Sequence, residues 1–183
     1  MIRDCLSRAN PTDPNLDAPW AHVLKIDASL GQQVWRCVLI HHLTGIENGG
    51  NHHVYVDLID SDGKPLVNPP QMLGWTWVGK RGDEPANDVR FDKAPPEPGA
   101  NIPLGKGQVA SVWIRGGLSD VVAGLRTDPS VDDEPGNSTF HHSTYVVFQR
   151  VMGGLKPLVP QPLTLEERFS ILEKRVDALE RTG

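Results

Sequence analysis

The fold class of this chain is decided by the stretch His53-Val54-Tyr55-Val56-Asp57-Leu58-Ile59-Asp60. Two sets of side chains alternate along it: Val54, Val56 and Leu58 against Tyr55, Asp57 and Ile59. An alternation with a period of two is typical of a β-strand, because successive side chains of a strand point to opposite faces of the sheet. The cluster Ser61-Asp62-Gly63 follows directly and predicts a turn. The stretch therefore indicates a short strand that ends in a tight turn.

Further strand-like runs flank this stretch on both sides. They are the segments Ala21 to Ile26, Gln33 to Leu43, Leu73 to Val78, Val89 to Phe91, Gln108 to Ile114, Val121 to Leu125 and Thr144 to Val151. Gly and Pro, with 18 and 16 residues of the 183, supply the turns between these runs and argue against a helical bundle. No helical pattern separates the runs. We therefore expect a mainly β fold, an antiparallel β-sandwich of immunoglobulin-like or jelly-roll-like type.

Composition divides the chain into four parts. Residues 1–19 hold three prolines among polar residues and suit an extended N-terminal arm. Residues 20–152 carry the strand pattern and form the predicted sandwich domain. Residues 153–162 are a Gly/Pro linker. In residues 163–183 proline is absent and the charge density rises, which predicts a short C-terminal helix.

A heptad pattern runs along this C-terminal segment. Apolar residues recur at spacings of four and three, at Leu165, Phe169, Leu172, Val176 and Leu179. Thr164 and Glu167 form a capping box that marks the start of the helix. Such a seam suits a coiled coil, and it also suits a helix that packs back onto its own domain.

The charges beside the seam favour a parallel coiled coil. Arg168 of one chain would face Glu173 of a parallel neighbour, whereas an antiparallel arrangement would set Arg against Arg. Arg175 and Glu180 repeat this pairing one heptad later, and both copies resemble the Arg-to-Glu signature of short trimeric coiled coils. We predict a parallel homotrimer, with a dimer as the alternative. The predicted oligomerisation residues are Leu165, Arg168, Phe169, Leu172, Glu173, Arg175, Val176, Leu179 and Glu180.

Charge and hydropathy disfavour several classes of protein. Lys and Arg number 18 against 23 Asp and Glu, and the longest basic cluster is Lys80-Arg81, so we expect neither nucleic acid nor anionic lipid as a partner. The longest apolar runs are far shorter than the roughly 20 residues of a membrane helix. The first residues lack the apolar core of a signal peptide, which predicts synthesis in a host cytoplasm. Two cysteines, Cys5 and Cys37, are too few for a disulfide scaffold.

The sequence gives little support for catalysis or a cofactor, and we predict that the protein is not an enzyme. Six histidines form adjacent pairs: His41-His42, His52-His53 and His141-His142. Neighbours on a strand point to opposite faces, so each pair offers one ligand to a given metal. Hydrogen-bonded histidines at strand ends are the simpler interpretation, and a metal site would need one histidine from each of several pairs. The stretch Asp60 to Gly63 predicts a hairpin turn better than a calcium loop.

Trp75 and Trp77 lie two residues apart and therefore on one face of a predicted strand. Two indoles on one face could stack on sugar rings or anchor a protein partner. Alternatively, they form core together with Trp113 and Phe148. The sequence leaves both possibilities open.

Scattered short motifs resemble immunoglobulin-like β-sandwich modules of bacteria and their phages, some of which are attached to glycoside hydrolases. The motifs cover about residues 50 to 150 and comprise Gly50 to Asp57, Gly74 to Trp77, Asp92 to Pro95, Gly99 to Pro103 and the stretch from Gly136-Asn137 to Phe148-Gln149. The overall plan of arm, small sandwich and short trimeric coil is similar to phage head-decoration and head-fibre proteins. This resemblance implies a virion structural protein.

The leading functional hypothesis is a non-enzymatic virion protein that binds a capsid or other virion protein as a trimer. In this hypothesis the arm attaches to the capsid through its apolar residues Ile2, Leu6, Leu16 and Trp20, which order on binding; a tail without a role is the alternative. The second hypothesis is a carbohydrate-binding module in which Trp75 and Trp77 contact a glycan. A hydrolase with a carboxylate or histidine site is the third.

Overall fold

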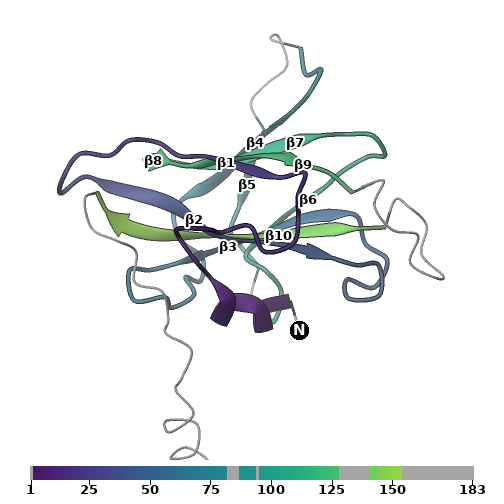
Figure 1. The fold of residues 1–183 in the computed structure, drawn as a ribbon, viewed down its shortest axis with the longest axis horizontal. Coiled ribbons are helices and arrows are strands. Elements are labelled where there is room, and N and C mark those ends of the chain that lie inside the picture. Colours follow the sequence, from purple (N-terminus) through teal and green to yellow (C-terminus); the bar gives the residue numbers. More distant parts are fainter. Residues whose placement is uncertain (1, 82–86, 94, 128–140, 154–183) are drawn as a thin grey trace, which may run out of the picture.

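The chain folds into a two-layered β structure, shown as a ribbon in Figure 1. The computed structural model describes residues 2–81, 87–93, 95–127 and 141–153, with side chains from residue 5 onward. Ten strands in the described residues form two five-stranded sheets, and one 3₁₀ helix, η1 (Ile2–Arg8), precedes them. The fold is mainly β, as the sequence predicts, and the two layers are consistent with a β-sandwich.

Sheet A has the strand order β6-β3-β10-β2-β8. Its strands are β6 (Ala100–Pro103), β3 (His53–Ile59), β10 (Ser143–Met152), β2 (Gln33–Leu43) and β8 (Leu118–Ser119). Sheet B has the order β1-β9-β7-β4-β5. Its strands are β1 (His22–Leu24), β9 (Val121–Leu125), β7 (Ala110–Arg115), β4 (Met72–Trp77) and β5 (Asn87–Arg90).

The pairing is not antiparallel throughout. All pairs in sheet B are antiparallel, but in sheet A β10 pairs with β3 in parallel, and β2 pairs with β8 in parallel. Every run that the sequence predicts as a strand overlaps one, and β2 and β9 have the predicted bounds. The strands β6 and β8 were not predicted. Both are short strands at the edges of sheet A.

The main core lies between the two sheets. The inner positions of β3 contribute Val54, Val56 and Leu58, and those of β7 contribute Ala110, Val112 and Ile114, all almost fully buried. Burial of such apolar side chains is the main source of stability in a domain of this kind. The outer face of sheet A carries a second buried cluster, which includes Leu39, Tyr145 and Val147.

A bulge in β2 separates these two clusters. The pairing of β10 with β2 steps from Leu39 to Cys37, so Val38 has no partner residue on β10. As a result Val38 and Leu39 both belong to the outer cluster, while Cys37 and Ile40 on either side belong to the main core. Burial raises the pKa of the Cys37 thiol far above its ordinary value, which suits an inert structural thiol.

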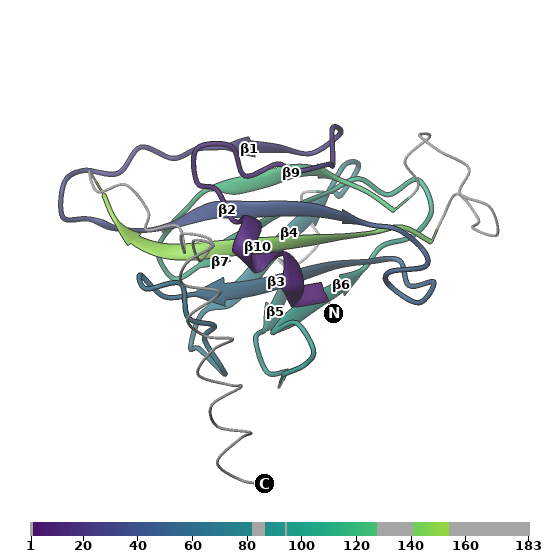
Figure 2. The ribbon, with the colours of Figure 1, turned by 60° about the horizontal axis from the view of Figure 1, so that its bottom comes forward.

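The N-terminal segment covers the outer face of sheet A and does not extend away from the domain. In Figures 1 and 2, η1 lies on the side of sheet A that faces away from sheet B. Cys5 and Ala9 are buried in the outer cluster. The segment then follows β2: the Asn10 amide donates to the Val38 carbonyl (2.7 Å), and the Leu16 amide donates to the Ile40 carbonyl (3.0 Å). The expectation of an extended arm over residues 1–19 therefore fails for these residues, because they cover an apolar sheet face.

A buried carboxylate connects the two sheets. Asp120, between β8 and β9, is fully buried and pairs with the Arg36 guanidinium at 2.7 Å. It also accepts hydrogen bonds from the backbone amides of Ile26 (3.0 Å) and Cys37 (3.1 Å). Its lone pairs are thus occupied, which is the condition under which a buried charge is tolerated.

Candidate ligand-binding pocket

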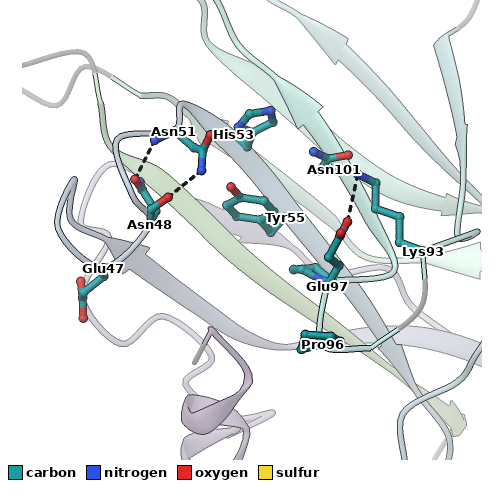
Figure 3. A pocket seen from close by; sticks show the side chains of 10 residues that line it. Glu47, Asn48, Asn51, His53, Tyr55, Lys93, Pro96, Glu97 and Asn101 are labelled. Carbon is teal, nitrogen blue, oxygen red and sulfur yellow. Dashed lines mark hydrogen bonds and ion pairs between the residues drawn. The ribbon is translucent and has the colours of Figure 1, made fainter.

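A pocket of about 420 Å³ opens on the outer side of sheet A, at the edge formed by β3 and β6. Its lining residues are Glu47, Asn48, Asn51, His53, Tyr55, Lys93, Pro96, Glu97, Pro98 and Asn101. Figure 3 shows Asn48 and Asn51 on one side of the hollow and Lys93, Glu97 and Asn101 on the other, with Tyr55 between them. A volume of this size suits a small ligand.

The floor of the pocket comes from two paired strands. His53 and Tyr55 lie two residues apart on β3, and Asn101 of β6 is in register with Tyr55, so all three side chains share the outer face. The rings of His53 and Tyr55 stack with their centroids 5.4 Å apart. Burial raises the pKa of Tyr55, an effect that contacts with Ser143 and Asn51 partly offset. The phenol therefore stays neutral, with its ring fixed in the floor.

One wall is the loop between β2 and β3, and Asn48 holds this loop in shape. The Asn48 side-chain amide donates to the His141 carbonyl (3.2 Å), and its oxygen accepts from the Asn51 backbone amide (2.9 Å). The Asn51 side chain donates back to the Asn48 carbonyl at 2.6 Å. Two of the pocket's amide side chains are thus used to build its wall.

The other wall is the loop before β6, and a buried carboxylate fastens it to the sheet. Asp57 is 1% exposed; it accepts hydrogen bonds from the Gly99 amide and from the Tyr145 hydroxyl, both at 2.7 Å. The same loop carries Lys93 and Glu97, which form a loose ion pair at 3.5 Å with the Glu97 side chain 67% exposed. Asp57 thus has a structural role, and the ion pair is accessible at the pocket rim.

Some polar groups at the pocket are not used within the described structure. The Asn101 side chain is partly exposed and makes no hydrogen bond to another described residue. Lys93 and Glu97 can offer donors and acceptors beyond their weak mutual contact. Together with the prolines and the Tyr55 ring, these groups can bind a ligand that has both hydroxyl or amide groups and apolar faces.

A second hollow lies beside β4 and β5, lined by Asn68, Pro69, Pro70, Gln71, Met72, Arg90, Phe91 and Asp92. Phe91, its aromatic residue, is only 3% exposed and belongs to the main core. This hollow offers a ligand less aromatic surface than the pocket on sheet A, where Tyr55 is 8% exposed and His53 beside it is partly exposed, so the pocket on sheet A is the better candidate.

The two tryptophans predicted as a binding surface belong to the inner face of sheet B. Trp75 and Trp77 are in register with the buried residues Val112 and Ala110, and Trp75 packs against the main core. Both indoles are partly buried, and their centroids are 5.1 Å apart. Trp113 points to the opposite, outer face, where its indole covers Gly74. Core packing is therefore the better description of Trp75, although Trp113 does not join it.

The predicted attachment residues are dispersed. Leu6 and Leu16 pack against the outer cluster of sheet A. Trp20 packs against the main core, and the Arg126 guanidinium lies 5.7 Å from the centroid of its ring. Ile2 belongs to η1, but its side chain is not described. Leu6, Leu16 and Trp20 therefore do not form one exposed surface.

The three histidine pairs meet at one end of sheet A. His42 Nε2 lies 2.7 Å from His142 Nδ1, and the His52 ring lies 6.4 Å from the His141 ring. Within the part of the chain that the structure describes, no three His, Cys, Asp or Glu side chains are placed to hold a metal ion. The Asp60 carboxylate accepts from the amides of Asp62 and Lys64, both at 2.9 Å, as in a hairpin turn.

The linker after Gly153 and the helix over residues 163–183 lie outside the described residues, together with all nine predicted oligomerisation residues: Leu165, Arg168, Phe169, Leu172, Glu173, Arg175, Val176, Leu179 and Glu180. The pocket itself was not predicted. One signal pointed toward it: Asn51, His53, Tyr55, Lys93 and Asn101 all fall within the short motifs that carry the resemblance to phage sandwich modules.

Comparisons with known proteins add no identification. No protein family, no curated protein and no solved structure matches this chain. Among the described residues, no helix is long and apolar enough to cross a membrane.

Proposed function

We propose that this chain is a non-enzymatic carbohydrate-binding protein, and that an oligosaccharide occupies the pocket on the outer side of sheet A. The observation that carries the proposal is the combination of an aromatic floor, Tyr55, with accessible polar groups of Asn101, Lys93 and Glu97 around a hollow of about 420 Å³. This differs from the surface of Trp75 and Trp77 that the sequence suggests, because those indoles face the core side of sheet B.

The chemistry of the lining fits a sugar ring. A sugar presents an apolar ring face, which packs on aromatic and proline side chains, and hydroxyl groups around its edge, which need donors and acceptors together. Lys93 supplies donors, Glu97 supplies acceptors, and the Asn101 amide supplies both. The amide also suits an acetamido group, so trisaccharides of glucose and of N-acetylglucosamine are the first probes.

The test is calorimetric titration of the full chain with these two trisaccharides at pH 7.5. We expect Asn101→Ala and Lys93→Ala each to weaken binding by about tenfold, the loss of one good hydrogen bond. Lys106→Ala, at an exposed lysine in a turn, is the matched control and leaves affinity unchanged. Loss of binding in Trp77→Ala but not in Asn101→Ala would contradict the pocket and restore the tryptophan site.

A second candidate role, that of a trimeric virion protein, is supported by the heptad seam from Leu165 to Leu179 and by the resemblance to phage modules. The proposal includes an immunoglobulin-like or jelly-roll-like sandwich and a C-terminal coiled coil. The two roles are compatible, because three copies on a capsid would raise the avidity of a weak sugar site. The N-terminal segment is not proposed as the attachment device, since it covers sheet A.

Sedimentation tests the trimer. Removing residues 163–183 is expected to convert a trimer to a monomer while the β-type circular dichroism stays. Arg168→Glu with Arg175→Glu places like charges opposite Glu173 and Glu180, and is expected to weaken association at low salt. An unchanged sedimentation coefficient in both variants would contradict the coil, and a chain that fails to co-sediment with phage heads would contradict the virion role.

A further inference from the structure

Six of the seven histidines gather at the end of sheet A beside the pocket. One pair ends β2, one begins β3, and one precedes β10, and these three strands are neighbours in the sheet. The seventh, His22, is exposed on β1 of sheet B. The proposed function makes no use of this cluster.

His42 and His142 share a short hydrogen bond of 2.7 Å between Nε2 and Nδ1. A hydrogen bond needs one donor and one acceptor, so one of these two nitrogens carries a proton and the other does not. An imidazolium carries a proton on each nitrogen and can only donate. Protonating both rings therefore breaks the bond and places two like charges in stacked rings whose centroids are 4.9 Å apart.

The surroundings of His42 oppose its protonation on balance. Burial lowers the pKa of His42 below its ordinary value, and His142 and His41 lower it further. The carboxylates of Asp17 and Glu47 act in the opposite direction but do not cancel this shift. The Trp20 ring, which meets the His42 ring edge-on at 5.0 Å, adds no charge.

His53, in the floor of the pocket, is also poorly placed to take a second proton. Its Nδ1 is buried and has no hydrogen-bond partner, so an imidazolium would bury an unsatisfied donor. Burial lowers the pKa of His53, and His52 and Lys93 lower it further. Tyr55, whose ring stacks on that of His53, stays neutral.

The residues on either side of His142 are hydrogen-bonded to the pocket wall. The His141 carbonyl, next to His142 in the chain, accepts from the Asn48 side chain that holds the loop between β2 and β3. The Ser143 hydroxyl, on the other side of His142, donates to the Asn51 carbonyl (3.2 Å) and accepts from the His53 amide (2.9 Å). A displacement of His142 therefore acts on both amide residues of that wall.

We propose that the histidine cluster is an acid-sensitive latch on the pocket: protonation of both rings of the His42–His142 pair, together with protonation of His53, breaks the contacts that hold residues 44–51 in place, and a bound sugar is released. The release of sugar rests on the proposed function, whereas the opening of the loop does not. The folded state protonates His42 and His53 less readily than the unfolded chain does. The stability that these two histidines contribute is therefore present above pH 6.5 and is lost as the pH falls below it.

Hydrogen–deuterium exchange on the full chain without sugar tests the latch, with rates corrected for the pH dependence of intrinsic exchange. Between pH 7.5 and 5.0 the protection of residues 44–51 and 141–143 is expected to fall by about tenfold, while that of β4 and β7 is nearly constant. An equal fall in both sheets, or no fall at the loop, would overturn the proposal.

His42→Gln separates the latch from general acid sensitivity, because its side-chain amide can still donate to His142 but does not titrate. It is expected to keep the loop protected at pH 5.0, whereas the control His22→Gln behaves like the unmodified chain. If His42→Gln fails to fold, NMR titration of the histidine rings in the unmodified chain decides instead: His42 and His53 are expected to take up their second protons together with opening of the loop. Uptake without opening would overturn the latch.

Titration with the N-acetylglucosamine and glucose trisaccharides completes the test. Affinity in the unmodified chain is expected to fall at least about tenfold from pH 7.5 to 5.0, and to fall much less in His42→Gln. Unchanged affinity at pH 5.0 despite an open loop would overturn control of the pocket by the latch. If neither trisaccharide binds at pH 7.5, both the proposed function and the release of sugar are contradicted. Hydrogen–deuterium exchange still decides whether acid opens the loop.

Discussion

The outer face of sheet A is covered by the chain's own first residues, whereas no described segment covers the outer face of sheet B. On sheet A, the outward side chains Leu39, Tyr145 and Val147 are buried beneath residues 5–16. On sheet B, the outward residues include the exposed Leu24, which is 55% exposed, and the half-exposed ion pair of Asp88 and Arg115.

This difference determines what polar residues do on each face. The outward carboxylate of sheet A, Asp57, is buried and bonded to Gly99 and Tyr145, so it fixes the wall of the pocket. The outward carboxylate of sheet B, Asp88, lies at the surface beside Arg115. A covered sheet face can support a preformed pocket at its edge, because its polar groups are held by fixed partners.

The strongest test of the comparison is removal of residues 1–16. Their loss would expose several large apolar side chains of sheet A, each worth about 1–2 kcal/mol, so the free energy of unfolding is expected to fall by about 4–6 kcal/mol. Urea unfolding measures this fall. The matched change on sheet B, Leu24→Ala, is expected to cost less than about 0.5 kcal/mol. A truncated chain as stable as the full one would return the N-terminal segment to the role of a free arm.

A smaller effect is expected from the two outward carboxylates. Asp57→Ala leaves the Tyr145 hydroxyl and the Gly99 amide without their acceptor in a buried site, at a cost of about 2–4 kcal/mol. Asp88→Ala removes a partly exposed ion pair and is expected to cost less than about 1 kcal/mol. Equal losses in thermal unfolding would show that the two faces do not differ in the way described.

The smallest effect concerns Gly74, beneath the Trp113 indole of sheet B. A Cβ at position 74 would lie 2.6 Å from Trp113 Cε2 and Nε1, so Gly74→Ala forces the ring to move. Because this face is open, the ring can swing outward, and the expected cost is only about 1–2 kcal/mol. In a Trp113→Ala background the same change is expected to cost nothing, and a double-mutant cycle measures the coupling. Equal costs in both backgrounds would show that the indole is not the obstacle.

Sequence periodicity predicted the strands in which apolar side chains either alternate with a period of two or follow one another without interruption. The alternation in β3 and the apolar run in β2 correctly located two strands of sheet A. The strand β6 has only four residues and ends in Pro103, so it carries too short a pattern to be recognised. Residues 1–16 read as polar and proline-rich, and nothing local to them indicates which surface their few apolar residues cover.

The pocket could not be predicted for a related reason. Asn48, Tyr55 and Lys93 are far apart in the sequence and become neighbours only because β6 returns to pair with β3. The paired tryptophans gave a stronger local signal, but spacing alone does not say which face of a strand is the inner one. The histidine pairs are a similar case: the sequence shows the pairs, and only the sheet order shows that they meet.

The central claim is that the pocket on sheet A binds an oligosaccharide, and NMR titration of ¹⁵N-labelled protein with the N-acetylglucosamine and glucose trisaccharides tests it most directly. The claim predicts that the trisaccharide that binds changes the chemical shifts most at the pocket residues Asn48, Asn51, Lys93 and Asn101. The indole signals of Trp75, Trp77 and Trp113 are expected to keep their chemical shifts. Saturable changes confined to those indoles, or no saturable change with either sugar at pH 7.5, would contradict it.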